Sequence, residues 1–94
     1  MSVARITTLN FKSKDGADQV EETYKNNAPT EFAEAEQLIE VRVNDTTLMF
    51  VSLYADNDAM ERASAARSKR MDLNKDLIES VDGKTGNVIL NHNK

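Results

Sequence analysis

The segment Leu48–Leu53 is apolar at every position except Ser52. A β-strand with one face in water alternates polar and apolar residues, whereas a strand covered on both faces is apolar throughout. The preceding segment, Leu38–Val43, is half polar, as suits the edge of a sheet, and Asn44–Thr47 has the residues of a tight turn. The sequence therefore predicts a hairpin whose second strand lies inside a sheet and is covered on both faces.

The residues before this hairpin predict a strand and a helix. Val3–Phe11 is rich in β-branched residues, which favour a strand. A helix is expected to begin near Asp15 and to end before Pro29, because the residue ahead of a proline avoids helical geometry. A short helical piece is expected over residues 29–37, with the proline in its first turn.

The residues after the hairpin predict a second helix and a last strand. Asp58 as N-cap and Glu61 three residues later make a capping box. The helical pattern continues to about Val81, with a break near Asp72 as an option, after which "DGKTG" predicts a turn and "NVIL" a strand. This order predicts an α+β, ferredoxin-like βαββαβ fold, with a four-stranded antiparallel sheet and helices on one face. One domain is expected over residues 1–94.

The hairpin turn sets which side chains share a face. A turn of two or four residues would pair odd positions of the first strand with even positions of the second. The face toward the helices would then carry Ile39, Val41, Val43, Leu48, Phe50, Ser52 and Tyr54. The opposite face would carry Leu38, Met49, Val51 and Leu53, with Glu40 and Arg42 at its rim.

Helices on one face leave the other face of the sheet open. A strand that is apolar on both faces then needs a second cover, and another copy of the same sheet can supply it. The sequence therefore predicts a homodimer packed sheet to sheet across a two-fold axis, a dimeric α/β barrel, with Glu40 and Arg42 able to pair across the axis. The alternative is a monomer whose own loops cover Met49, Val51 and Leu53.

Composition excludes several classes of function. The chain has no cysteine and a single histidine, His92, so no metal site and no cofactor are expected. The net charge of −4 argues against nucleic-acid binding that depends on counterion release. The N-terminal residues lack the apolar core of a signal peptide, and no apolar run reaches the length of a membrane helix. We expect a cytoplasmic protein with no membrane partner.

Arginine residues on an apolar helix stripe are the first candidates for a ligand pocket. Arg67 and Arg70 fall on the same arc of the second helix as Ala63 and Met71. A guanidinium group cannot lose its charge, so on a core-facing stripe it needs an anion or a route to water. Either Arg67 points into a pocket and binds an anion, or both arginines extend to solvent or pair with Glu40 or Asp76.

Hydroxyl and amide groups on the sheet and on the first helix are the other pocket candidates. Ser52 and Tyr54 interrupt the face that is assigned to the helices, and Tyr24 lies on the apolar stripe of the first helix. Asn10 is a further candidate on the first strand. Neither face of that strand is cleanly apolar, so the sequence leaves open which one meets the helices.

Two stretches carry a resemblance to a known superfamily. "FKSKDGADQVEETY" is similar to the strand, glycine-containing loop and amphipathic helix of the dimeric α/β-barrel proteins, especially the antibiotic-biosynthesis-monooxygenase-like group. "LMFVSLYADNDAMERASAARS" is similar to the strand and capped helix that follow in that group. ACT-type amino-acid-binding domains share the element order and are a more distant alternative.

The resemblance implies a ligand pocket between the helices and the sheet of each subunit. Members include cofactor-independent oxygenases and haem-degrading enzymes, but this chain has neither the tryptophan nor the helix histidine that haem degradation uses. The expected protein is a small homodimer that binds a partly apolar, anionic molecule, with monooxygenase-like activity as one possibility. The alternative is a non-catalytic ligand-sensing or interaction module.

Overall fold

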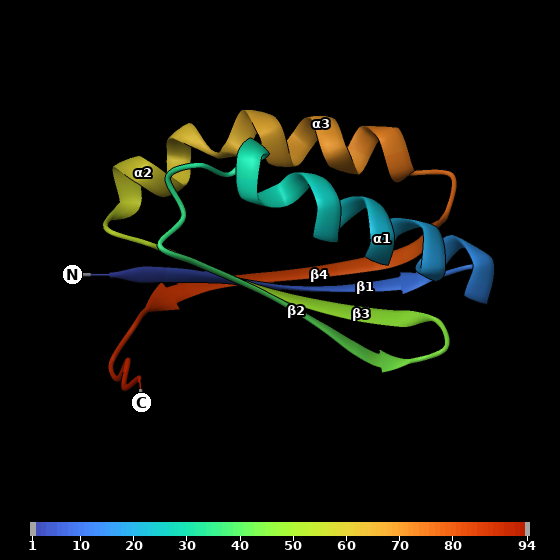
Figure 1. Cartoon of the computed structure of the whole chain (residues 1–94), viewed down its shortest axis with the longest axis horizontal. Helices are drawn as coiled ribbons and strands as arrows, with labels where there is room; N and C mark the ends of the chain where they lie inside the picture. The colour runs from blue at the N-terminus through green and yellow to red at the C-terminus, as the bar shows by residue number, and fades with distance from the viewer. Residues whose placement is uncertain (1, 94) are drawn as a thin grey trace.

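The computed structural model describes residues 2–93, so the two end residues of the expected 1–94 domain lie outside the described residues. Its elements are β1 (Val3–Phe11), α1 (Lys14–Glu31), β2 (Gln37–Asn44), β3 (Thr47–Tyr54), α2 (Asn57–Arg62), α3 (Ser64–Asn74) and β4 (Ile78–Asn87). The strands form one antiparallel sheet in the order β2-β3-β1-β4. Figure 1 shows all three helices on one side of this sheet. The predicted ferredoxin-like α+β fold is confirmed.

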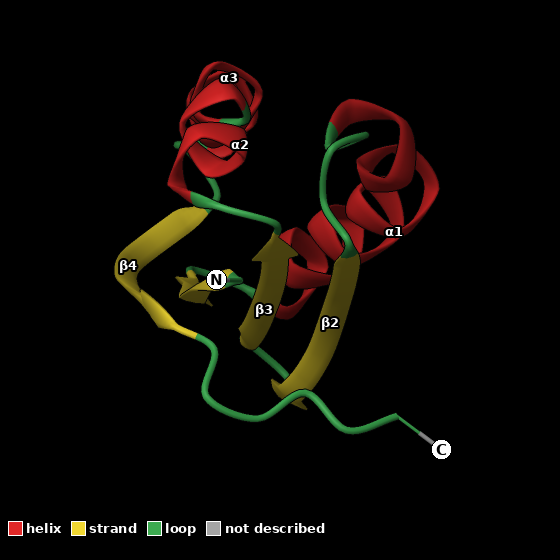
Figure 2. Ribbon diagram, turned by 90° about the vertical axis from the view of Figure 1, so that its left-hand side faces the viewer, coloured by secondary structure: helices red, strands yellow, loops and turns green. Residues whose placement is uncertain are grey.

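The core lies between the sheet and the helices. Odd-numbered residues of β1 and even-numbered residues of β3 face the helices, and α1 contributes the stripe Val20, Tyr24 and Ala28. Leu48, Val20 and Tyr54 are the largest side chains that are completely buried. Figure 2 shows α1 on one side and the α2–α3 pair on the other, both above the same face of the sheet.

The first helix begins near Asp15, as predicted, but differs from the sequence prediction at its C-terminal end. It begins at the N-cap Ser13, whose hydroxyl accepts a hydrogen bond from the Gly16 amide at 3.1 Å. It does not end before Pro29 but runs through it to Glu31, and no separate helical piece follows. Ala28 and Phe32 continue the buried stripe at a spacing of four residues, and this burial outweighs the local cost of the proline.

The second half of the chain also differs. Asp56, rather than Asp58, is the N-cap, with its carboxylate accepting from the Ala59 amide at 2.8 Å. The helical region divides at Ala63 and ends at Asn74, so Val81 and the "DGKTG" segment belong to a strand, while most of "NVIL" lies beyond it. Pairing of β4 along the whole of β1 explains the difference, because tertiary pairing overrides the weak strand propensity of glycine and lysine.

The hairpin has a two-residue turn, one of the two predicted lengths, but not the predicted pairing. Asn44 lies opposite Thr47, and the register then shifts between Arg42 and Asn44. This bulge adds one residue to β2, so Glu40 faces Phe50 and Arg42 faces Leu48. A shift of one residue exchanges the two faces of a strand. The prediction for β2 was therefore wrong, although the pattern of β3 was interpreted correctly.

The exchange moves the two charged residues of β2 to the helix side. Arg42 does not lie at the rim of the open face but pairs with Glu21 at 2.9 Å and Asp18 at 3.0 Å, both on α1. Glu40 lies beside α1 as well, in a groove with Tyr24. Ile39 and Val41 take their places on the open face.

The open face of the sheet is apolar across three strands. Ile39 lies opposite Val51, which pairs with Ile6, and Val41 lies opposite Met49. Ile6, Ile39 and Val41 are each about 40% exposed, at 43%, 38% and 45%. Leu53 shares this face by its pairing but is already buried in the single chain. None of the helices within residues 2–93 is both long enough and apolar enough to cross a membrane.

Candidate ligand-binding site

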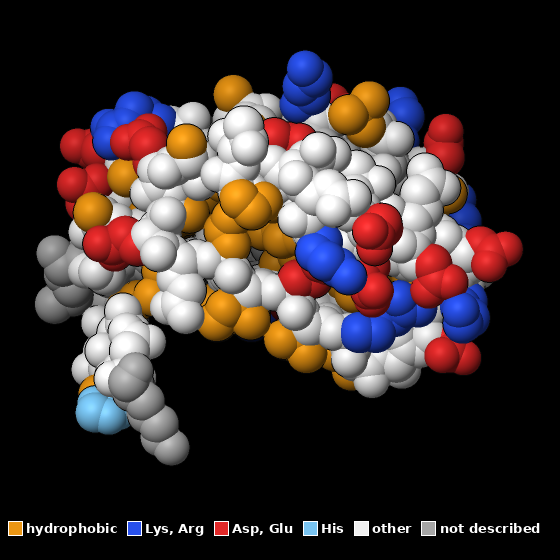
Figure 3. Space-filling view, in the orientation of Figure 1, with side chains coloured by type: hydrophobic (Ala, Val, Ile, Leu, Met, Phe, Trp, Pro, Cys, Tyr) orange, Lys and Arg blue, Asp and Glu red, His pale blue; other side chains and the backbone are white. Residues whose placement is uncertain are grey.

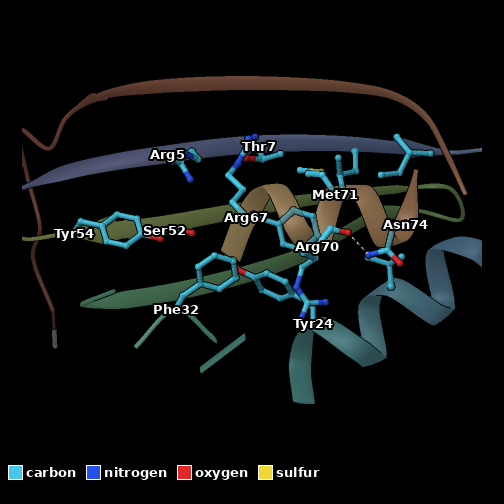
Figure 4. A pocket seen from close by; sticks show the side chains of 14 residues that line it. Arg5, Thr7, Tyr24, Phe32, Ser52, Tyr54, Arg67, Arg70, Met71 and Asn74 are labelled. Carbon is cyan, nitrogen blue, oxygen red and sulfur yellow. Dashed lines mark hydrogen bonds between the residues drawn. The ribbon is translucent and has the colours of Figure 1, made fainter. Parts of the chain in front are cut away.

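A small cavity lies between the sheet and the helices α1 and α3. Its floor is the helix face of β1 and β3, and its volume is about 50 Å³. One side of the cavity is apolar and largely aromatic, formed by Val20, Tyr24 and Phe32 together with Phe50 of the floor. The polar groups that face it are Arg5, Thr7, Ser52, Tyr54, Arg67, Arg70 and Asn74, and Figure 4 shows how they converge from β1, from β3 and from α3.

Arg67 reaches from α3 down to the sheet. Figure 4 shows its side chain beside Thr7 of β1, and Gly83, the β4 partner of Thr7, leaves room for the guanidinium group. A Cβ atom on Gly83 would lie 3.3 Å from Nη2 of Arg67. Burial and the neighbouring Arg5 guanidinium lower the pKa of Arg67. Both causes disfavour the charged form, so the site holds an arginine whose charge is poorly compensated.

Arg5 is the second cation of the cavity. It lies on β1, two residues before Thr7, and its Nη2 makes one long contact of 3.5 Å with the Ser64 hydroxyl. Among residues 2–93, no carboxylate lies within ion-pair distance of Arg5 or Arg67, although Arg42, Arg62 and Arg70 all have such partners. Two guanidinium groups therefore face one cavity without a counter-charge.

Arg70 is engaged differently. It makes a two-pronged ion pair with Glu31 at the end of α1, at 2.5 Å and 3.2 Å, and its guanidinium carbon lies 5.6 Å from the centre of the Tyr24 ring. This side chain spans from α3 to α1 above the cavity. Its partner is Glu31 and not Glu40 or Asp76, which were the alternatives from the sequence.

The predicted pocket residues divide into two groups. Arg67, Tyr24, Ser52 and Tyr54 all line the cavity. The ring of Tyr24 packs on Phe50 at 4.5 Å, and burial raises the pKa of the Tyr24 hydroxyl, with Ser52 acting in the opposite direction.

Asn10 is the predicted pocket residue that does not line the cavity. Its side chain accepts a hydrogen bond from Thr47 at 2.8 Å and donates one to Ser80 at 3.0 Å, across the neighbouring strands. Even positions of β1 face away from the helices, so the placement of Asn10 in the pocket was wrong. The sequence analysis missed Arg5 for the same reason. The apolar alternation Val3, Leu9 and Phe11 was the signal that the odd face of β1 is buried.

Glu40 has the most perturbed carboxyl group of the described residues. Burial, and then the charge of Glu21, raise its pKa from 4.5 to about 7. One of its oxygens, Oε2, is buried and receives no hydrogen bond from residues 2–93. Glu40 lies on the far side of Tyr24 from the cavity and does not line it.

Comparisons with known proteins place the fold but not the activity. No protein-family model and no curated protein matches the sequence. Solved structures match over almost the whole chain. A dimeric ferredoxin-like protein from an uncultured marine organism is 9% identical, with a TM-score of 0.80 over 99% of this chain and 92% of the other.

Two further structures connect the fold with oxygenases. A protein from Caulobacter crescentus, classed provisionally as an antibiotic biosynthesis monooxygenase, is 12% identical with a TM-score of 0.79 over 95% of this chain and 91% of its own. SnoaB, a cofactor-independent oxygenase from Streptomyces nogalater, is 13% identical with a TM-score of 0.74 over 96% of this chain and 95% of its own. The chain thus has the ferredoxin-like fold of antibiotic-biosynthesis-monooxygenase-like structures, as the resemblance implied.

The raised pKa of Glu40 makes a prediction about stability. The folded chain holds this proton more tightly than the unfolded chain, so the stability of the fold falls as the pH rises from about 4.5 to about 7. Glu40→Gln removes that dependence. After allowance for solvent screening of this half-exposed group, the variant gains about 1 kcal/mol of unfolding free energy relative to wild type between pH 5 and pH 8.

Urea unfolding at the two pH values measures this difference. Glu79→Gln, which makes the same change at an exposed position of β4, is the matched control. If wild type and Glu40→Gln have parallel pH profiles, Glu40 does not titrate abnormally in the folded chain.

Proposed function

We propose that the protein binds a small, partly apolar anion in the cavity between its helices and its sheet. The observation that supports this is the pair Arg5 and Arg67, whose guanidinium groups face one cavity. No carboxylate among the described residues lies within ion-pair distance of either group. Placing like charges together in a poorly solvated site is costly unless an anion joins them. The aromatic wall opposite suits the apolar part of such a ligand.

The size of the cavity limits the ligand. At about 50 Å³ it is smaller than the cavity of roughly 150 Å³ that is known to hold a benzene molecule. A ring-bearing ligand therefore requires movement of side chains at the cavity mouth. Met71 and Arg67 are the long, flexible candidates, because both are only partly buried and both project from α3.

Homodimerisation is the second part of the proposal. The open face of the sheet presents Ile6, Ile39, Val41, Met49 and Val51 as one continuous apolar surface, which is a feature of interaction sites. The structure from the marine organism is described as dimeric. A second copy packed on this face gives β3 the cover that its apolar pattern requires. We also propose a cytoplasmic location.

A cofactor-independent oxygenase is the second candidate activity, supported by the likeness to SnoaB. In that chemistry Arg5 and Arg67 would stabilise an enolate, which then reacts with oxygen. The step needs a base, yet none of the cavity-lining residues is Asp, Glu or His, and the raised pKa of Tyr24 makes it a poor one. The cavity chemistry therefore favours binding over catalysis.

Benzoate tests the anion site, with neutral benzamide as its isostere. We expect benzoate to bind and benzamide to bind at least tenfold more weakly, since a charge-assisted hydrogen bond contributes about 1.5–3 kcal/mol. Arg67→Met should weaken benzoate roughly tenfold in a calorimetric titration. Arg62→Met, at an exposed arginine that pairs with Glu34, is the control and should leave benzoate binding unchanged. Equal affinity for benzoate and benzamide would contradict the proposal.

Val41→Arg tests the dimer. A charge placed at this open-face position, opposite Met49, cannot be buried against a second sheet, so the variant should be monomeric where wild type is dimeric. Native mass spectrometry or light scattering after gel filtration measures the mass. Leu73→Arg, at a position on α3 that is 76% exposed, is the matched control and should stay dimeric. A monomeric wild type would exclude this interface.

Oxygen uptake separates the two candidate activities. A binding module should not accelerate oxygen consumption by a panel of autoxidisable quinols, while an oxygenase should do so saturably. An oxygen electrode measures the rate, with Arg67→Met as the control for a reaction in this cavity. Saturable uptake that the variant loses would overturn the preference for binding without turnover.

A further inference from the structure

A groove lies on the outer side of Tyr24, between α1 and the edge strand β2. It has a volume of about 300 Å³ and is lined by Tyr24, Lys25, Ala28, Pro29, Leu38 and Glu40. Tyr24 also lines the anion cavity, so its ring stands between the two sites. Figure 3, which views the molecule from the side of α1 and β2, shows apolar side chains exposed in a hollow below the helices. The groove is mostly apolar and carries one acidic group, Glu40, and one basic group, Lys25, at its lining.

That acidic group lacks a hydrogen-bond donor. Oε2 of Glu40 is the one buried side-chain polar atom without a partner among residues 2–93. The bulge in β2 puts it there, because the shifted register turns Glu40 toward α1. Burial removes the hydration of such an oxygen, and without a donor nothing compensates for that cost in free energy. An unmatched group of this kind therefore points to a missing partner.

The basic groups around Glu40 are already engaged. The charges that face it are Glu21, Glu22 and Lys25 from α1 and Arg70 from α3. Lys25 lies 3.6 Å from Glu22, and Arg70 is held by Glu31. Arg42, the next charged residue of β2, is held by Glu21 and Asp18. The surroundings of Glu40 therefore favour a cation that comes from outside the chain.

We propose that this groove is a binding site for a small primary amine, separate from the anion cavity. The ammonium group donates to the carboxylate of Glu40, and the apolar stem of the amine packs on Ala28, Pro29 and Leu38. An ammonium group has three donors in any direction, and the terminal torsion of a glutamate rotates easily, so either oxygen can turn toward the ligand. The hydrogen bond is charge-assisted, which makes it stronger than a neutral one.

A single carboxylate suits an amine better than a metal ion. Calcium takes six to eight oxygen ligands, and magnesium is held by one or two carboxylates together with waters or phosphates. Within residues 2–93 no three His, Cys, Asp or Glu side chains are grouped to hold a metal ion, and the other lining groups are apolar or cationic. An apolar stem with one ammonium end matches both features of the groove.

Benzylamine and benzyl alcohol are the probes, because they share a ring and differ in charge. In amide-detected NMR titrations of wild type, benzylamine should shift the signals of Ala28, Leu38 and Glu40 in a saturable manner. Benzyl alcohol should bind at least tenfold more weakly. Equal binding of the two probes, or shifts confined to cavity residues such as Thr7 and Ser52, would overturn the proposal. This comparison needs no variant and so does not depend on the folding of one.

Glu40→Gln is the variant test, and Glu79→Gln is its matched control on the opposite edge of the sheet. The first should weaken benzylamine at least tenfold, and the second should leave it unchanged. Benzylamine stays protonated between pH 6 and pH 8, whereas Glu40, with a pKa of about 7, ionises over this range. The affinity of wild type should therefore rise about tenfold from pH 6 to pH 8. Unchanged affinity in Glu40→Gln, or a flat pH profile, would overturn the proposal.

Discussion

The pairing of β1 with β3 on one side and β4 on the other is the constraint on which the rest of the structure depends. β1 is the first strand in the chain but lies inside the sheet, so its alternation decides what the helices cover. Its odd face carries Leu9 and Phe11 into the core and Arg5 and Thr7 into the cavity. One strand thus supplies both the packing that holds the helices and two polar groups of the candidate site, Arg5 and Thr7.

The features that could be predicted from the sequence are those that strong local patterns encode. The segment that forms β3 is apolar on both faces, which indicated an interior strand whose second face is open. The order of strands and helices indicated the fold. Arg67 was found because a charge on an apolar helix stripe is conspicuous. These signals depend on periodicity within one element, which the chain carries whatever its neighbours do.

The features that were missed depend on pairing between elements. The bulge at residues 42–44 has no strong local signature, yet it exchanged the faces of β2 and so misplaced Glu40 and Arg42. The segment after Asn74 resembles a continuing helix and then a turn, because Gly83 and Gly86 favour neither strand nor helix. It becomes β4 only because β1 offers it a complete row of backbone partners.

The charges of the cavity and of the groove are connected through the position of Arg70. Glu31 lies at the C-terminal end of α1, where its negative charge is repelled by the negative end of the helix dipole. The last turn of the helix has no basic residue of its own. Arg70 supplies the missing positive charge there, with its guanidinium group stacked over Tyr24. If Arg70 paired with Glu40 instead, the carboxyl group of the groove would be satisfied, but the end of α1 would be left with an unmatched negative charge.

The preference of Arg70 for Glu31 therefore leaves a carboxylate without a donor on one side of Tyr24. On the other side of the same ring, Arg5 and Arg67 lack an acceptor. Tyr24 lines both the cavity and the groove, so the two sets of unmatched charges lie on either side of its ring. The unmatched carboxylate of the proposed groove thus follows from an ion pair that stabilises the end of a helix. The unmatched guanidinium groups have another origin, because Arg5 is placed by the alternation of β1 and Arg67 by the apolar stripe of α3.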